Sequence, residues 1–184
     1  MIGILPKSLD VGGQYCKINS DYRVILNLFE VLQSSELTDL EKAYISVKSI
    51  YVDEIPDRLF TEAVKKAYWF CDGGDMPKSE PAKVRLIDYK HDEGIIFPAI
   101  NKAAGCEVRA VPYMHWWTFI GLVMEIRESV VSTVLNLRQK KNRGKKLEKH
   151  EKEFWDENKG ICVLKARLTD EEKAEKDALE KALG

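Results

Sequence analysis

Three histidines and four cysteines are the residues of this chain best suited to bind a metal ion or to act as bases and nucleophiles. The cysteines, Cys16, Cys71, Cys106 and Cys162, stand far apart and include no C-x-x-C pair. A tetrahedral zinc site usually takes two of its ligands from such a local pair. We therefore expect no metal site in this protein.

His91 and Asp92 together match the metal-binding dipeptide of phosphohydrolases, but the chain lacks the further histidine and aspartate residues that such sites need. We interpret the two residues instead as a partly exposed polar pair in the first turns of a helix. Acidic side chains at that position, Asp88, Asp92 and Glu93, interact favourably with the helix dipole.

His115 precedes Trp116 and Trp117, but no nucleophile elbow with a serine or cysteine accompanies it. A single histidine cannot do the work of a catalytic triad. Its expected role is to satisfy a buried carbonyl or to cap the start of a helix. The chain also lacks the glycine-rich motifs that bind dinucleotides and phosphates. We therefore expect a protein that is not an enzyme and that uses no cofactor.

A strongly basic stretch spans Arg138–Lys149, where only Glu148 opposes seven lysine and arginine residues. These residues could contact phosphates, but no aromatic side chains interleave them for base stacking. A solvated helix end, or a tail that pairs with the acidic C-terminal residues, explains the stretch more simply. Nucleic-acid binding stays as a minor alternative, because the net charge of −1 gives no overall attraction to nucleic acid or to a membrane surface.

The cysteines and the apolar runs also indicate the cellular compartment in which the protein is expected. Scattered cysteines in a chain of 184 residues favour reduced, buried thiols over disulfides. Met1–Lys7 lacks the basic region and long apolar run of a secretory signal, and no apolar run is long enough to span a membrane. These features predict a cytoplasmic protein.

The most apolar stretch, Tyr113–Ile126, carries apolar residues at helical spacing on two faces, so it is expected to lie in the middle of the core. Pro112 can open the helix, and a one-sided apolar pattern continues to Leu137, which predicts one long helix. Trp116 and Trp117 point in different directions on such a helix. We expect at least one of them in the core, where truncation would cost about 3–5 kcal/mol, and the other could anchor a partner.

The rest of the chain is expected to cover this helix. Ser8–Ile18 predicts a β-hairpin that turns at Gly12-Gly13. Further helices are predicted from Asp21, from a capping box at Thr38–Glu41, from Pro56 and from about Asp88. The second of them is expected to bury Leu40, Tyr44 and Val47, with Tyr51 as a further candidate.

The composition, 45% hydrophobic and 32% charged, is typical of a helix-rich globular protein with one core. The predicted fold is mostly α, a helical bundle around a central long helix with a small N-terminal β-hairpin. We assign residues 1–140 to this core domain and residues 141–184 to a charged, mobile C-terminal extension, whose last helix would begin at a capping box at Thr169.

The stretch from Tyr113 to Leu122, with His115–Phe119 as its most specific part, resembles a family of tail proteins from long, flexible-tailed phages and prophages of Gram-positive bacteria. Members are often labelled gene product fifteen and are grouped with the tail assembly chaperones. Asp88–Asp92, Tyr68–Phe70 before Gly73-Gly74, and Asp21–Ile25 fit the same pattern, so the resemblance covers residues 18–140.

This resemblance implies a non-enzymatic helical protein of the bacterial host cytoplasm. It would bind the phage tape-measure protein, keep it soluble, and give way when tail-tube protein subunits polymerise around it. Self-association is also possible. The residues placed at the partner contact are Tyr113, His115, Trp116, Trp117 and Phe119. Two other roles stay open: a structural connector retained in the virion, and a nucleic-acid-binding helical adaptor that uses Arg138–Lys149.

Overall fold

A computed structural model describes residues 3–34, 36–75 and 86–164. These residues form a hairpin and a series of helices, which confirms the mostly α fold with a small N-terminal β-hairpin. The elements in chain order are β1 (Ser8–Val11), β2 (Gln14–Lys17), α1 (Tyr22–Leu32), α2 (Asp39–Ile50), η1 (Asp57–Leu59), α3 (Phe60–Cys71), α4 (Glu93–Ala104), η2 (Val108–Ala110), α5 (Trp116–Met124), α6 (Val130–Asn142), α7 (Lys149–Glu157) and α8 (Lys159–Cys162).

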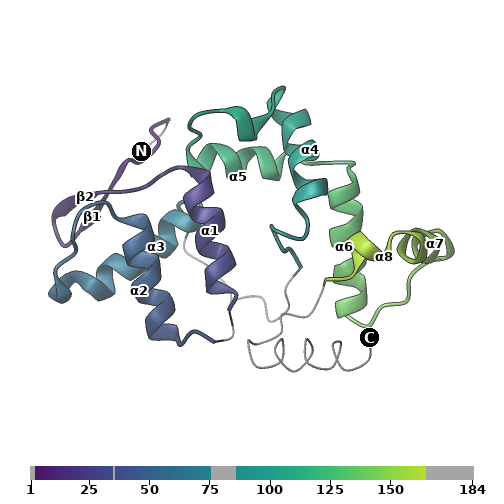
Figure 1. Cartoon of the computed structure of the whole chain (residues 1–184), viewed down its shortest axis with the longest axis horizontal. Helices are drawn as coiled ribbons and strands as arrows, with labels where there is room; N and C mark the ends of the chain where they lie inside the picture. The colour runs from purple at the N-terminus through teal and green to yellow at the C-terminus, as the bar shows by residue number, and fades with distance from the viewer. Residues whose placement is uncertain (1–2, 35, 76–85, 165–184) are drawn as a thin grey trace, which may run out of the picture.

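The helices form two groups joined by α4 and α5. The hairpin and α1–α3 lie on one side, and α6–α8 lie on the other (Figure 1). Most buried apolar side chains belong to one cluster that extends from the hairpin to Val131 at the start of α6. A smaller cluster lies between α6, α7 and α8, and its buried members are Val134, Leu137, Trp155 and Cys162.

The hairpin packs against α3. An isolated pair of strands is only marginally stable in water and needs such a contact. Its strands are antiparallel, with Val11 opposite Gln14 across the Gly12-Gly13 turn. Both glycines have positive φ, and a Cβ at Gly12 would lie 2.7 Å from the Leu59 side chain. The turn therefore requires glycine for its backbone angle and, at Gly12, for its close approach to the start of α3.

The first three helices begin and end with local signals that the sequence carries. The Asp21 side chain caps α1 by accepting from Arg23 N at 2.9 Å. The predicted capping box of α2 is confirmed, because the Thr38 side chain and the Glu41 carboxylate each accept from the other residue's backbone N–H. Helix α3 ends before Gly73-Gly74, both with positive φ.

The prediction of one long helix from Tyr113 to Leu137 is wrong. Helix α5 ends at Met124, and α6 begins only at Val130. Between them Glu128 has a φ of 44°, which breaks helical geometry, and the Ser129 side chain then caps α6 by accepting from Ser132 N. The chain thereby turns back so that α6 packs against α4.

The fourth helix starts at Glu93 and not near Asp88, because residues before it form a tight turn. The Asp88 carboxylate accepts from the backbone N–H groups of Lys90 and His91, each at 3.0 Å. Pro98 lies on the exposed side of α4 and does not end it, and Gly105 caps the helix with a φ of 69°.

A buried ion pair between Arg138 of α6 and Asp92 joins three separate segments. The two Nη atoms of Arg138 each donate at 2.7 Å to one carboxylate oxygen of Asp92. Its remaining N–H groups donate to the backbone carbonyls of Leu86, Ile161 and Cys162 at 2.6–2.9 Å. A guanidinium group carries five N–H donors, so each of them has a partner here. The interpretation of Asp92 as partly exposed is wrong, since its side chain is 2% exposed.

Part of the predicted C-terminal extension, residues 149–162, forms α7 and α8. These helices pack on α6 through Trp155 and Cys162. The capping box at Thr169 and the helix predicted after it lie outside the described residues.

We predict that Arg138→Met lowers the free energy of unfolding by about 3–5 kcal/mol, because it leaves the Asp92 carboxylate buried without its counter-ion. Arg143→Met is the matched control, since Arg143 is an exposed arginine that follows the same helix. Its expected effect is within about 0.5 kcal/mol. Urea unfolding followed by circular dichroism measures both, and similar losses in the two variants would contradict the structural role of Arg138.

The four cysteines differ in burial, and this predicts their reactivity. Cys16, Cys71 and Cys162 are buried, and Cys106 is exposed. Burial raises the pKa of the Cys16 and Cys162 thiols and raises the pKa of Cys71 to about 12, which disfavours the reactive thiolate. In the folded protein at neutral pH we expect a thiol reagent to modify Cys106 rapidly and the others only after denaturation. Cys106→Ser should remove the fast phase, and fast modification of a second thiol would contradict this assignment.

Candidate partner-binding site

The residues predicted to contact a partner lie at the start of α5, where this helix meets α1 and α3. Short backbone hydrogen bonds join the two helix starts: Trp116 N donates to Ser20 O at 2.7 Å, and Tyr22 N donates to Met114 O at 3.0 Å. Helix α5 therefore begins at Trp116, and not at Tyr113 after Pro112, because His115 is extended and forms an isolated antiparallel bridge with Asp21.

His115 has both of the structural roles expected for it. Its Nδ1 atom accepts from Trp117 N at 3.0 Å and so caps α5. Its Nε2 atom lies 2.9 Å from the carbonyl oxygen of Pro6. Because Nδ1 is an acceptor, the neutral ring carries its proton on Nε2 and donates it to that carbonyl. The side chain is buried and links the N-terminal segment to α5.

Trp116 and Trp117 both bind the end of α3. The indole Nε1 of Trp116 donates to Cys71 O at 2.8 Å, and that of Trp117 donates to Phe70 O at 2.9 Å. Carbonyls in the last turn of a helix lack intrahelical partners. The Trp116 bond satisfies Cys71 O, and the Trp117 bond adds a second donor to Phe70 O, which also accepts from Gly73 N at 3.2 Å. Trp116 is buried, and Trp117 is half-buried.

Gly74 allows Trp117 to reach this position. It has a φ of 93°, and a Cβ there would lie 2.9 Å from Cη2 of the Trp117 ring. The glycine pair therefore ends α3, and Gly74 also makes room for the indole that donates to the carbonyl of Phe70.

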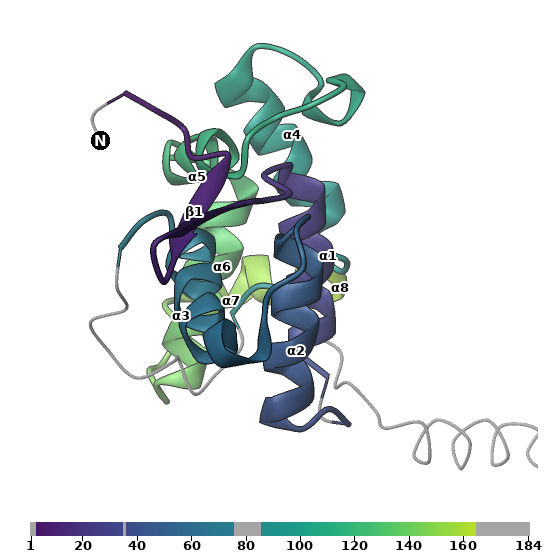
Figure 2. The same ribbon diagram turned by 90° about the vertical axis from the view of Figure 1, so that its left-hand side faces the viewer.

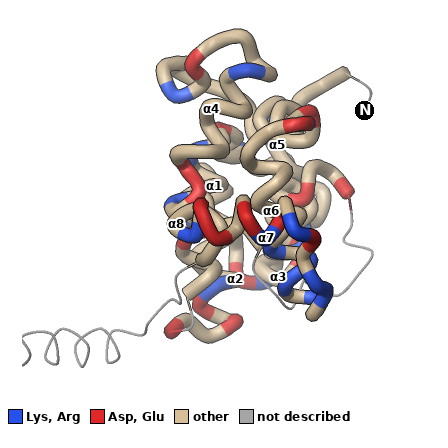
Figure 3. Tube along the Cα trace, turned by 90° about the vertical axis from the view of Figure 1, so that its right-hand side faces the viewer, with Lys and Arg blue, Asp and Glu red and all other residues tan. Residues whose placement is uncertain are grey.

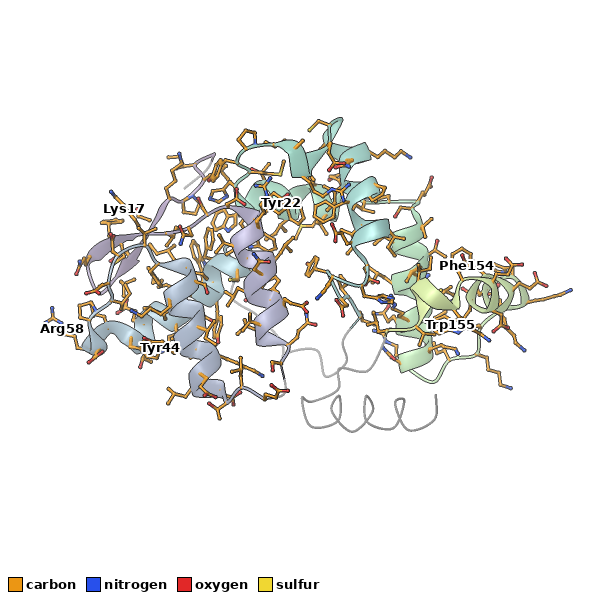
Figure 4. All side chains as sticks on the ribbon, viewed as in Figure 1. Lys17, Tyr22, Tyr44, Arg58, Phe154 and Trp155 are labelled. Carbon is orange, nitrogen blue, oxygen red and sulfur yellow. The ribbon has the colours of Figure 1, made fainter. Side chains whose placement is uncertain are left out.

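Phe119 lies at the centre of the aromatic core. Its ring stacks on Tyr22 of α1, with centroids 4.4 Å apart and planes inclined by 6°. Trp116 also stacks on Phe119, with ring centroids 5.8 Å apart. Tyr22 is labelled in Figure 4, where α1 meets α5.

The five residues predicted to contact a partner thus differ in how far their side chains are exposed. His115, Trp116 and Phe119 are buried and have no surface to offer in this conformation. Tyr113 is 47% exposed, although its hydroxyl is hydrogen-bonded to Ser20 Oγ at 2.7 Å. Only Tyr113 and the half-buried Trp117 could touch a partner directly, and their role in binding stays a prediction.

A different apolar surface is open on α2. We call it the α2 groove; its volume is about 580 Å³, and its lining residues are Leu37, Leu40, Glu41, Tyr44, Ile45, Asp57 and Phe60. The prediction that Leu40 and Tyr44 are buried is wrong, since they are 73% and 54% exposed. The apolar stripe of α2 is continuous, but its neighbours cover only the second half, at Val47 and Tyr51. The first turns of α2 project beyond α3 (Figure 2).

A second open groove lies between the hairpin and α3. We call it the hairpin groove, and its volume is also about 580 Å³. The exposed Tyr15 and the half-buried Trp69 provide its large apolar surface. Its charged lining is mixed, with Asp10, Glu62, Lys65 and Lys66.

The basic stretch is less available than the sequence suggests. Arg138 is buried against Asp92, Lys140 forms an ion pair with Glu151, and the Lys141 ammonium lies 4.3 Å above the ring centroid of Trp155. Acidic and basic residues are interspersed along α7 and its surroundings (Figure 3). Three of the seven basic residues are therefore engaged within the fold, which weakens the nucleic-acid alternative.

The part of the chain that the structure describes offers neither a metal site nor a membrane-spanning helix. Residues 3–34, 36–75 and 86–164 include no group of three or more histidine, cysteine or acidic side chains placed to hold a metal ion. Within the same ranges no helix has both the length and the apolar character needed to cross a membrane.

Comparison with known proteins gave one result. The family model described as Bacteriophage Gp15 protein matches residues 1–164. No curated protein and no solved structure matches the chain.

We predict that Gly74→Ala lowers the free energy of unfolding by about 2–4 kcal/mol, because it adds left-handed backbone strain and a clash with Trp117. Gly105→Ala is the matched control: Gly105 also follows a helix with positive φ, but a Cβ there meets no atom within 4 Å. Its expected cost is about 1–2 kcal/mol, from backbone strain alone. Equal losses in urea unfolding would show that the contact between Gly74 and Trp117 is not tight.

Proposed function

This chain belongs to the Bacteriophage Gp15 protein family, and we propose that it acts as a phage tail assembly chaperone. In this role it binds the tape-measure protein in the host cytoplasm and keeps it soluble. It then leaves as tail-tube subunits polymerise around the tape measure.

The observation that carries this proposal is the uncovered apolar face of α2. A tape-measure protein that forms coiled coils presents apolar stripes along its helices, and such stripes aggregate when they are not covered. An apolar groove between helices can hold one of them, helix in groove. The α2 groove offers Leu40 and Tyr44 for this purpose.

The shallow groove also fits a partner that must later be released. Burying a large apolar side chain contributes about 1.5–3 kcal/mol, and association itself costs several kcal/mol. A site with two exposed anchors therefore gives modest affinity for any one segment. Many copies bound along one long partner would still keep that partner covered. Each copy can dissociate by itself while the others stay bound.

Co-expression with the tape-measure protein of the same phage tests the proposal. We expect the tape measure to move from the insoluble to the soluble fraction and to co-purify with this chain. The matched control is the tape measure expressed with an unrelated helical protein of similar size. A tape measure that still precipitates and is not retained would contradict the chaperone role.

Mass spectrometry of purified virions separates this role from the structural alternative. A chaperone that gives way to tail-tube subunits should be absent or scarce in mature particles. Stoichiometric presence in every particle would instead identify a connector or tail-completion protein.

A further inference from the structure

We propose that the α2 groove binds an amphipathic helix whose apolar stripe is flanked by lysine or arginine residues. This inference rests on the proposed chaperone function and assigns the surface and the partner chemistry. It differs from the sequence-based prediction, which places the contact at the start of α5.

The first argument is the arrangement of the apolar residues. Leu37, Leu40 and Tyr44 recur at three and four residues, so they form a stripe along one side of α2 and its entry. This is the spacing at which one helix packs its side chains against another. An occupant that follows the stripe for its whole length is therefore a helix lying along α2. Tyr44 is labelled on this helix in Figure 4.

The second argument is that the groove is already formed. Its floor consists of Ile45 and Phe60, which are partly buried and pack against the main apolar cluster. A partner therefore finds a fixed surface and does not have to order it. Preformed apolar sites with a few polar residues at the rim are the usual form of a binding pocket.

The third argument is charge complementarity. Both charged residues that line the groove, Glu41 and Asp57, are acidic. Hydrogen bonds from the backbone and hydroxyl of Thr38 lower the pKa of the Glu41 carboxyl, so this rim stays negative at neutral pH. The Lys48 ammonium lies 5.7 Å from the centroid of the Tyr44 ring, and Lys42 and Arg58 adjoin Glu41 and Asp57 in the sequence, but none of these three cations lines the groove. An acidic rim selects basic flanks on the partner and steers its approach.

The hairpin groove does not support an equally definite assignment. Its lining carries two lysines and two acidic residues, so charge does not specify a partner there. The basic stretch of a second copy is also a poor occupant for the α2 groove. The apolar residue of that stretch, Leu147, packs against the cluster of α6–α8.

The test compares Leu40→Glu with Met124→Glu in the full chain, co-expressed with the tape-measure protein. Leu40 and Met124 are both 73% exposed, so the two substitutions change surface residues of equal exposure. We expect Leu40→Glu to lower the amount of tape measure retained per chain about tenfold or more, since the loss of one interface anchor commonly has that effect. Met124→Glu should retain it as the wild-type chain does. Circular dichroism and urea unfolding establish that both variants fold.

A second pair of variants tests the acidic rim. Asp57→Lys should weaken retention and reduce its sensitivity to salt, whereas Asp75→Lys, an exposed acid beyond the other end of α3, should change neither. Equal retention by Asp57→Lys and the wild-type chain would overturn the assignment of a basic partner.

The outcomes separate this inference from the proposed function. If the wild-type chain itself fails to retain the tape measure, the chaperone function fails. If the wild-type chain and Leu40→Glu retain it equally, the function stands and the α2 groove is not the site. If Leu40→Glu instead converts an oligomer of this chain to a monomer and leaves retention unchanged, a second copy occupies the groove and the inference is overturned.

Discussion

Two indole N–H groups at the start of α5 satisfy the last carbonyls of α3, and the arrangement of the first three helices depends on them. The end of a helix can be buried only if its free carbonyls find partners. Trp116 supplies the partner of Cys71 O, and Trp117 adds a second donor to Phe70 O beside Gly73 N. Both rings bring large apolar surface to the same place. The His115 cap and the Gly74 turn both serve this contact, one by starting α5 there and the other by making room for the ring.

The second group of helices depends on a polar interaction instead. A buried guanidinium is tolerated only when its charge is paired and its donors are bound. Arg138 meets both conditions by collecting Asp92 and three backbone carbonyls from segments far apart in the sequence. Its geometry therefore fixes where α8 and the turn before α4 lie relative to α6.

The sequence predicts the local structure well and the long-range contacts poorly. Caps, glycine turns and the hairpin depend on residues within a few positions of each other, so the Thr38–Glu41 box is readable from the chain alone. The end of helix α5 at Met124 cannot be read from the chain alone, because the apolar spacing continues past it. The interruption between α5 and α6 depends on Glu128 and Ser129. Arg138 looks like one of several solvated cations until Asp92 is placed beside it. Leu40 and Tyr44 share the stripe of Val47, and the sequence does not reveal that α3 covers only part of that stripe. Reasoning from the sequence therefore places the candidate site at α5, where the strongest apolar pattern belongs to the core.

The separation of the apolar side chains into a large and a small cluster has a dynamic consequence. Protein segments open locally with free energies that follow the apolar contacts they must break. The cluster of α6–α8 has four buried apolar members, far fewer than the cluster around α5. Backbone amides of α7 and α8 should therefore exchange with solvent by a partial opening that leaves α1–α5 folded. The protein would then behave as two cooperative units, and α7 and α8 could rearrange without disturbing the helices that carry the α2 groove.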